Sequence, residues 1–211
     1  MFKKLLTAVL IASMLVLPVN SVSPADYEES SVPAQGQDYL PGDVPAETVP
    51  ADAMSPALHA LVLAMLNHDA GAFQLSDSEL AWEALYNMLS LYGQLDSRSA
   101  SDRGELLLPE ETVRDYAAAL GADLDDLGAL PAGIRDRLNY DNVSRCYVVV
   151  CGDDGLARLQ VEDIQSVSGM LHLSGALVYT VDGEALARFQ AVLCPRDSMF
   201  GYAVSQMSLT A

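Results

Sequence analysis

Hydrophobic residues recur at helical spacing in three segments between positions 55 and 121. The first helix is predicted from Ser55 to about Asn67, because Ser is a favoured N-cap and Pro56 suits the first helical position. This segment is apolar almost all round and too short to span a bilayer. We therefore expect it to lie in the core.

The other two predicted helices have clearer ends. Ser76 and Glu79 form a capping box that predicts the start of the second helix, and Gly93 is expected to end it in the left-handed conformation. The third helix is predicted from Pro109, followed by two glutamates in its first turn, to Gly121. The polar, Ser-rich stretch 94–105 between these helices is predicted to be a surface loop.

From Arg145 onwards the apolar residues alternate, which predicts strands near 145–150, 157–161, 171–181, 184–193 and 200–209. Asp182-Gly183 between two alternating runs is a strong hairpin signal, whereas 162–169 is ambiguous. This order predicts an α+β fold, with about three N-terminal helices packed on one face of a four- to five-stranded antiparallel, curved sheet.

The N-terminal region differs from the rest of the chain. Two lysines precede the apolar run Leu5–Val19, and small residues follow it, which is typical of a secretory signal peptide over residues 1–25. Residues 26–54 hold several prolines and acidic residues and no basic residue, so we expect an extended, disordered linker. Residues 55–211 are predicted to form a single domain. We expect this domain to be secreted or otherwise extracytoplasmic, a location that is compatible with association with a cell surface.

The chain is strongly acidic, with a formal charge of −18, and removal of the signal would take away its only two lysines. Such a charge disfavours nucleic acid and anionic lipid as partners, and no stable membrane insertion is expected after signal cleavage. Acidity is commonly a solubility device, and capture of cations is the alternative. Half of the residues are hydrophobic, which predicts a folded protein.

The three cysteines, Cys146, Cys151 and Cys194, allow at most one intramolecular disulfide. A bond from Cys194 to either of the others and three free thiols both remain open. A thiol with His172 as its base is a possible nucleophilic pair. Cys146 and Cys151 are five residues apart and face opposite sides of a strand, where cysteines usually serve as small buried hydrophobes.

Carboxylates offer a second candidate chemistry, because Glu79 and Glu83 flank Trp82 as acids do in sugar hydrolases. Helix capping and the helix dipole explain acids in a first turn equally well. The three histidines lie too far apart for a typical zinc site, and the acidic stretch 123–128 lacks the ligand spacing of a calcium loop. The sequence therefore predicts no metal and no cofactor.

Aromatic residues on the predicted strands suggest a binding face. Tyr147, Tyr179, Phe189 and Tyr202 would line the concave side of a curved sheet. The alternative is that these rings pack beneath the second and third helices.

The segment LPEETVRDYAAALGADLDDLGALP, the following DG-centred hairpins and the closing MFGYAVSQMSLT resemble uncharacterised exported proteins of anaerobic Gram-positive gut bacteria. This resemblance covers roughly residues 105–211, and it implies a signal sequence, an acidic linker and a small α+β domain. The order of elements is also similar to NTF2-like or cystatin-like domains. These resemblances imply no particular catalytic residue, because NTF2-like proteins include both enzymes and binding modules.

Together these features predict an exported noncatalytic module that binds an unknown protein or small-molecule ligand. The alternative is a small extracellular hydrolase with a Cys-His or carboxylate site.

Overall fold

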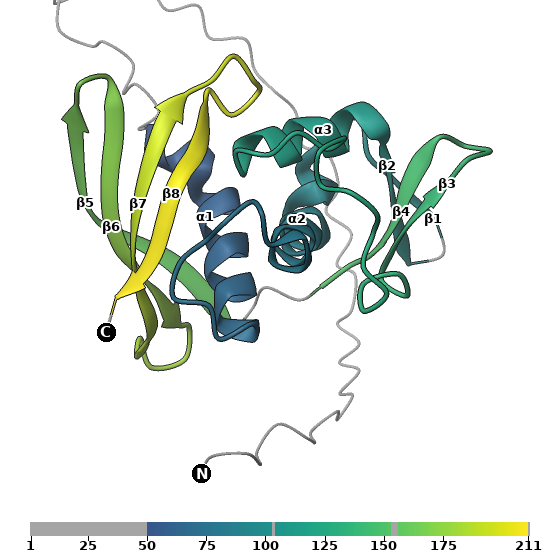
Figure 1. Cartoon of the computed structure of the whole chain (residues 1–211). Helices are drawn as coiled ribbons and strands as arrows, with labels where there is room; N and C mark the ends of the chain where they lie inside the picture. Colours follow the sequence, from purple (N-terminus) through teal and green to yellow (C-terminus); the bar gives the residue numbers. More distant parts are fainter. Residues whose placement is uncertain (1–49, 103, 153–155, 211) are drawn as a thin grey trace, which may run out of the picture. The chain divides into compact units, whose positions relative to one another are not determined.

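The computed structural model describes residues 50–102, 104–152 and 156–210, which belong to the compact unit Val44–Ala211. Within these residues the chain forms three α-helices and two four-stranded antiparallel sheets (Figure 1). The α+β class and the antiparallel pairing predicted from sequence are confirmed. The predicted signal peptide and residues 26–49 of the predicted linker lie outside the described residues.

The helices are α1 (Pro50–Asn67), α2 (Ser78–Tyr92) and α3 (Glu110–Ala119), and the short 3₁₀ helix η1 (Gly93–Leu95) follows α2. The first sheet has the order β1-β2-β4-β3 and contains β1 (Ala100–Asp102), β2 (Glu105–Pro109), β3 (Leu138–Asp141) and β4 (Cys146–Val150). The second sheet has the order β5-β6-β7-β8 and contains β5 (Ala157–Val167), β6 (Met170–Tyr179), β7 (Ala185–Pro195) and β8 (Tyr202–Thr210).

Helix α1 begins five residues before the predicted start, so residues 50–54 are helical and do not belong to a linker. Ser55 lies inside the helix, where its hydroxyl donates to the carbonyl oxygen of Ala51 at 3.3 Å. Ala51 and Met54 are buried, which extends the apolar surface of α1 by a turn. This burial offsets the backbone hydrogen bond that Pro56 cannot donate.

The start of α2 differs from the prediction, whereas its end at Gly93 agrees in position and differs in conformation. The N-cap is Asp77 and not Ser76, because the Asp77 carboxylate accepts a hydrogen bond from the Leu80 backbone N–H at 3.1 Å. Gly93 has a right-handed φ of −58°, and the chain continues into η1. A Cβ atom at this position would lie 2.9 Å from Leu106 Cδ2, so the buried side chain of Leu106 would have to shift to admit one.

The prediction of one sheet after three helices is also wrong. β1 and β2 lie between α2 and α3, partly in the stretch predicted to be a loop, and β3 follows α3. β2 pairs with β4, so that Leu106 lies opposite Val149. Pairing between segments about 40 residues apart depends on tertiary contacts that the local spacing of apolar residues does not show.

The third helix agrees with the prediction. Val113, Tyr116, Ala117 and Leu120 are buried, and the helix is followed by Gly121 at a left-handed φ of +82°. A Cβ atom on Gly121 would lie 2.3 Å from the carbonyl oxygen of Val204 in β8. The end of α3 therefore contacts the backbone of the second sheet directly.

The second sheet is a meander of four strands. Its β6–β7 hairpin contains the predicted turn, in which Gly183 has a φ of +76°. Residues 162–167 of the ambiguous stretch extend β5, and Ser168-Gly169 forms the turn into β6. The far edge, β8, is bonded to the segment after α1: Phe73 N–H donates to the Met207 carbonyl at 2.9 Å, and Leu209 N–H donates to the Gly71 carbonyl at 3.0 Å.

The inner face of the second sheet packs against α1 (Figure 1). Alternate residues of β7, Phe189, Ala191 and Leu193, are buried there, as their spacing predicts. The same hydrophobic core includes residues of α2, α3 and the first sheet. No described helix has the length and hydropathy needed to cross a membrane.

Gly121→Ala should lower the free energy of unfolding by about 3 kcal/mol, because it adds a backbone collision to the cost of a left-handed φ. Gly128→Ala is the matched control, since Gly128 has a φ of +73° and open space around its Cβ position. It should cost only about 1 kcal/mol in urea denaturation. Equal losses for the two variants would show that the contact with Val204 is not tight.

Asp77→Ala should lower the free energy of unfolding by about 1 kcal/mol through loss of the N-cap of α2. Ser76→Ala should change it by less than about 0.5 kcal/mol, because Ser76 is exposed and precedes the cap. Thermal and urea unfolding of the two variants measures both values. A larger loss for Ser76→Ala would restore the capping box predicted from sequence.

Candidate ligand-binding site

The four aromatic residues predicted to line one face do not lie on one face. Tyr147 belongs to the first sheet, where the centroid of its ring lies 4.9 Å from that of Tyr140. Burial raises the pKa of the Tyr147 hydroxyl. Phe189 is 1% exposed on the inner face of the second sheet, where a ligand cannot reach it. Tyr179 and Tyr202 are half-buried, and Tyr202 packs against the core. The structure thus separates the predicted binding residues.

The three cysteines are free thiols. Cys146 is half-buried and Cys151 exposed, both at the first sheet, whereas Cys194 lies half-buried on β7. Of the three cysteines, Cys194 lies on the strand next to His172, because His172 pairs with Val192 and Cys194 is two residues further along β7. Its Sγ contacts the carbonyl oxygen of Ala203 at 3.6 Å, and no thiol–imidazole hydrogen bond occurs in the described ranges.

The paired carboxylates of α2 also separate. Glu83 is buried and forms an ion pair of 3.0 Å with Arg137, whose guanidinium lies 4.4 Å from the ring centroid of Tyr86. Glu79 is exposed in the first turn of the helix. The ion pair with Arg137 gives Glu83 a structural role, and Glu79 and Glu83 do not face each other across a cleft.

The acidic stretch 123–128 is bound to α3 through Arg114, whose guanidinium lies 2.9 Å from a carboxylate oxygen of Asp125. That guanidinium holds the pKa of Asp125 below its ordinary range. Among the residues that the structure describes, no three His, Cys, Asp or Glu side chains form a group able to hold a metal ion.

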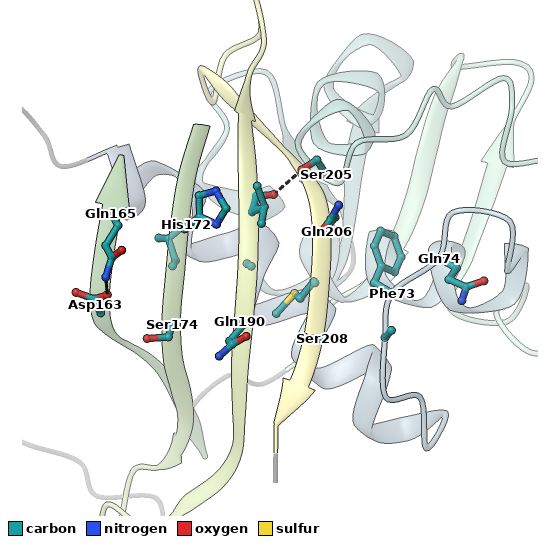
Figure 2. Close-up of a pocket in the computed structure, with 15 residues that line it drawn as sticks. Phe73, Gln74, Asp163, Gln165, His172, Ser174, Gln190, Ser205, Gln206 and Ser208 are labelled. Atoms are coloured by element: carbon teal, nitrogen blue, oxygen red, sulfur yellow. Dashed lines mark hydrogen bonds between the residues drawn. The ribbon is translucent and has the colours of Figure 1, made fainter. Parts of the chain in front are cut away.

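A different set of side chains surrounds a hollow of about 560 Å³ on the outer face of the second sheet (Figure 2). Its polar lining comes from β5, β6, β7 and β8, and the strand register arranges these residues as two rows across the sheet. The first row is Gln165, His172, Val192 and Gln206. The second row is Asp163, Ser174, Gln190 and Ser208.

Two β-bulges bring residues into these rows. The register shifts between Val161 and Asp163, so that Asp163 points outward although simple alternation would turn it inward. A second shift lies opposite Val192 and leaves Ser205 and Gln206 both exposed on β8. Bulges of this kind redirect side chains, and here they add polar groups to the outer face.

One border of the hollow is the segment 72–74 after α1. Ala72 forms a β-bridge with Ser208, which attaches this segment to the edge of β8. Phe73 is half-buried and contacts the core as well as the hollow, while Gln74 is exposed beside it. Backbone hydrogen bonds to β8 and the packing of the Phe73 ring against the core therefore hold this border in place.

Most polar groups of the hollow are available to a ligand. Gln165 donates to Asp163 at 2.8 Å, and Ser205 donates to the Val192 carbonyl at 3.0 Å. The side chains of four other lining residues make no hydrogen bond within the described part of the protein: Ser174, Gln190, Gln206 and Ser208. These exposed or half-exposed groups can exchange water for a ligand without breaking an internal bond.

The sequence analysis singled out His172 but did not predict the site. Asp163 and Gln165 fell in the ambiguous stretch, because a bulge breaks the alternation that identifies a strand. The rows also depend on pairing between strands, which no single strand reveals. Polar residues at alternate positions of β6 and β7 were the available signal.

No family model, curated protein or solved structure matches this chain.

Proposed function

We propose that this chain is an exported, noncatalytic binding module whose ligand site is the hollow on the outer face of β5–β8. The observation that carries this proposal is the alignment of two polar rows from four strands over one depression of about 560 Å³. This volume falls within the usual range for small-molecule sites, roughly 300–1,000 Å³. The signal-like N-terminal sequence supports a location outside the cytoplasm.

The rigidity of the floor supports binding. The lining side chains stand on strands that are paired on both sides in β6 and β7, and the opposite face of the sheet is packed against α1. Strand pairing fixes the backbone positions from which the lining side chains extend, so no backbone has to become ordered when a ligand binds.

Catalysis has weaker support from the same face. Asp163, His172 and Ser174 share it, and these are the residue types of an acid–base–nucleophile set. A working set needs the base hydrogen-bonded to both of its partners. Within the described ranges the carboxylate of Asp163 accepts from Gln165, and no hydrogen bond joins the three residues to one another. The geometry therefore favours binding over hydrolysis.

The proposed site can be located by NMR with small probes of several chemical classes: glycerol, trialanine, acetate and ethylammonium. With the full chain, we expect backbone amide shifts to cluster at residues 163–165, 172–174, 190–192 and 206–208. Shifts that cluster on the first sheet, or that spread evenly over the surface, would contradict the proposed site.

A blocking variant provides the matched comparison. Ser174→Trp should fill the hollow and reduce the probe-induced shifts by more than about fivefold, because the indole displaces the bound probe. Ser101→Trp on the exposed strand β1 places the same side chain on the other sheet and should leave the shifts unchanged. Retention of the shifts in folded Ser174→Trp would remove the hollow as the site.

Cysteine labelling tests the hydrolase alternative. Cys151 should react fastest with a maleimide, because it is the exposed thiol, and Cys146 and Cys194 should react several-fold more slowly. Mass spectrometry of peptides at successive times measures the three rates. Faster reaction at Cys194, abolished by His172→Ala, would reveal an activated thiol and favour the enzyme.

A further inference from the structure

The charge and hydrogen-bonding chemistry of the hollow indicate its ligand class, and this inference rests on the proposed function. We infer that the outer face of β5–β8 binds a neutral, hydroxyl-rich ligand, namely a short segment of an uncharged saccharide.

The lining is close to neutral although the whole chain is strongly acidic. Among the described residues of the lining, Asp163 is the only carboxylate and none is a lysine or an arginine. Arg188, which lies two residues before Gln190 on β7, forms an ion pair of 2.8 Å with Glu162. An anionic ligand would meet no lysine or arginine in this lining and a single histidine, His172, and a metal or amine would meet one carboxylate, which already accepts a hydrogen bond from Gln165. Charge complementarity therefore selects an uncharged ligand.

The lining groups both donate and accept hydrogen bonds. Side-chain amides of Gln165, Gln190 and Gln206 carry two donors and an acceptor, and each serine hydroxyl carries one donor and two lone pairs. Sugar hydroxyls have the same dual character, so a polyol can satisfy several of these groups at once. Val192, half-buried between His172 and Gln206 in the first row, offers a small apolar surface for the C–H groups of a ring.

The backbone of the floor distinguishes a saccharide from an extended peptide. Peptides that bind to sheets usually add a strand at a free edge and use main-chain hydrogen bonds. Here β6 and β7, which form the floor of the hollow, are paired on both sides, and the edge of β8 is bonded to residues 71–73. Among the described residues no strand pairs with the outer edge of β5, but that edge lies at the border of the hollow and not in its floor. The hollow therefore presents side chains and few free backbone groups, which suits a ligand recognised through its own hydroxyls.

The test is a titration of the full chain with three neutral trisaccharides: maltotriose, cellotriose and N,N′,N″-triacetylchitotriose. Trigalacturonate and trialanine serve as anionic and peptide probes of similar length. We expect at least one neutral trimer to bind with shifts at His172, Gln190 and Gln206, and trigalacturonate to bind at least tenfold more weakly. Isothermal titration calorimetry supplies the dissociation constants.

Two variants connect binding to the rows. Gln190→Ala and Gln206→Ala should each weaken the trisaccharide about tenfold, the loss expected when one well-placed amide with more than one hydrogen bond is removed. Gln94→Ala is the control, because Gln94 is an exposed glutamine in η1, outside the hollow. It should leave the dissociation constant unchanged.

The possible outcomes separate this inference from the proposed function. Binding of trialanine or trigalacturonate at the same residues, without any neutral trimer, would overturn the saccharide class and leave the binding site in place. Absence of binding by all five probes at 10 mM would overturn the saccharide inference, and absence of shifts with the smaller probes as well would overturn the site itself.

Discussion

The outer face of the second sheet depends on burial of its inner face. Phe189, Ala191 and Leu193 alternate inward on β7 and pack towards α1, and because side chains in a strand have a period of two, this burial fixes which residues point outward. A slip of one residue would place these apolar side chains in water and the polar rows in the core. The rows of the candidate site are therefore a consequence of hydrophobic register, modified at two bulges.

The rest of the described chain supports that register from the other side. Helix α1 lies between the second sheet and α2, and the end of α3 meets β8 where Gly121 approaches the carbonyl of Val204. The first sheet covers α2 and α3, so its residues stabilise the core without lining the hollow. This division separates a supporting half from the half that carries the candidate site, although one hydrophobic core joins them.

Local signals predicted the elements better than their arrangement. The spacing of apolar residues predicted α3, the buried face of β7 and the turn at Asp182-Gly183, because each depends on neighbouring residues. It did not predict β2 or the existence of a separate first sheet, since the partners of β2 lie about 40 residues away in β4. The candidate site was not predicted for the same reason, because its rows form only when four strands pair. The predicted binding face consisted of aromatic residues, whereas mostly polar residues line the hollow.

The β-bridge between Ala72 and Ser208 pairs the segment after α1 with β8, the last described strand. Contacts between positions so far apart form slowly, because a long loop must close before they contribute any stability. If the chain leaves the cytoplasm N-terminus first, α1 emerges long before the strand that secures the segment behind it. The border of the hollow would then be completed only after β8 had emerged, later than every other described helix and strand.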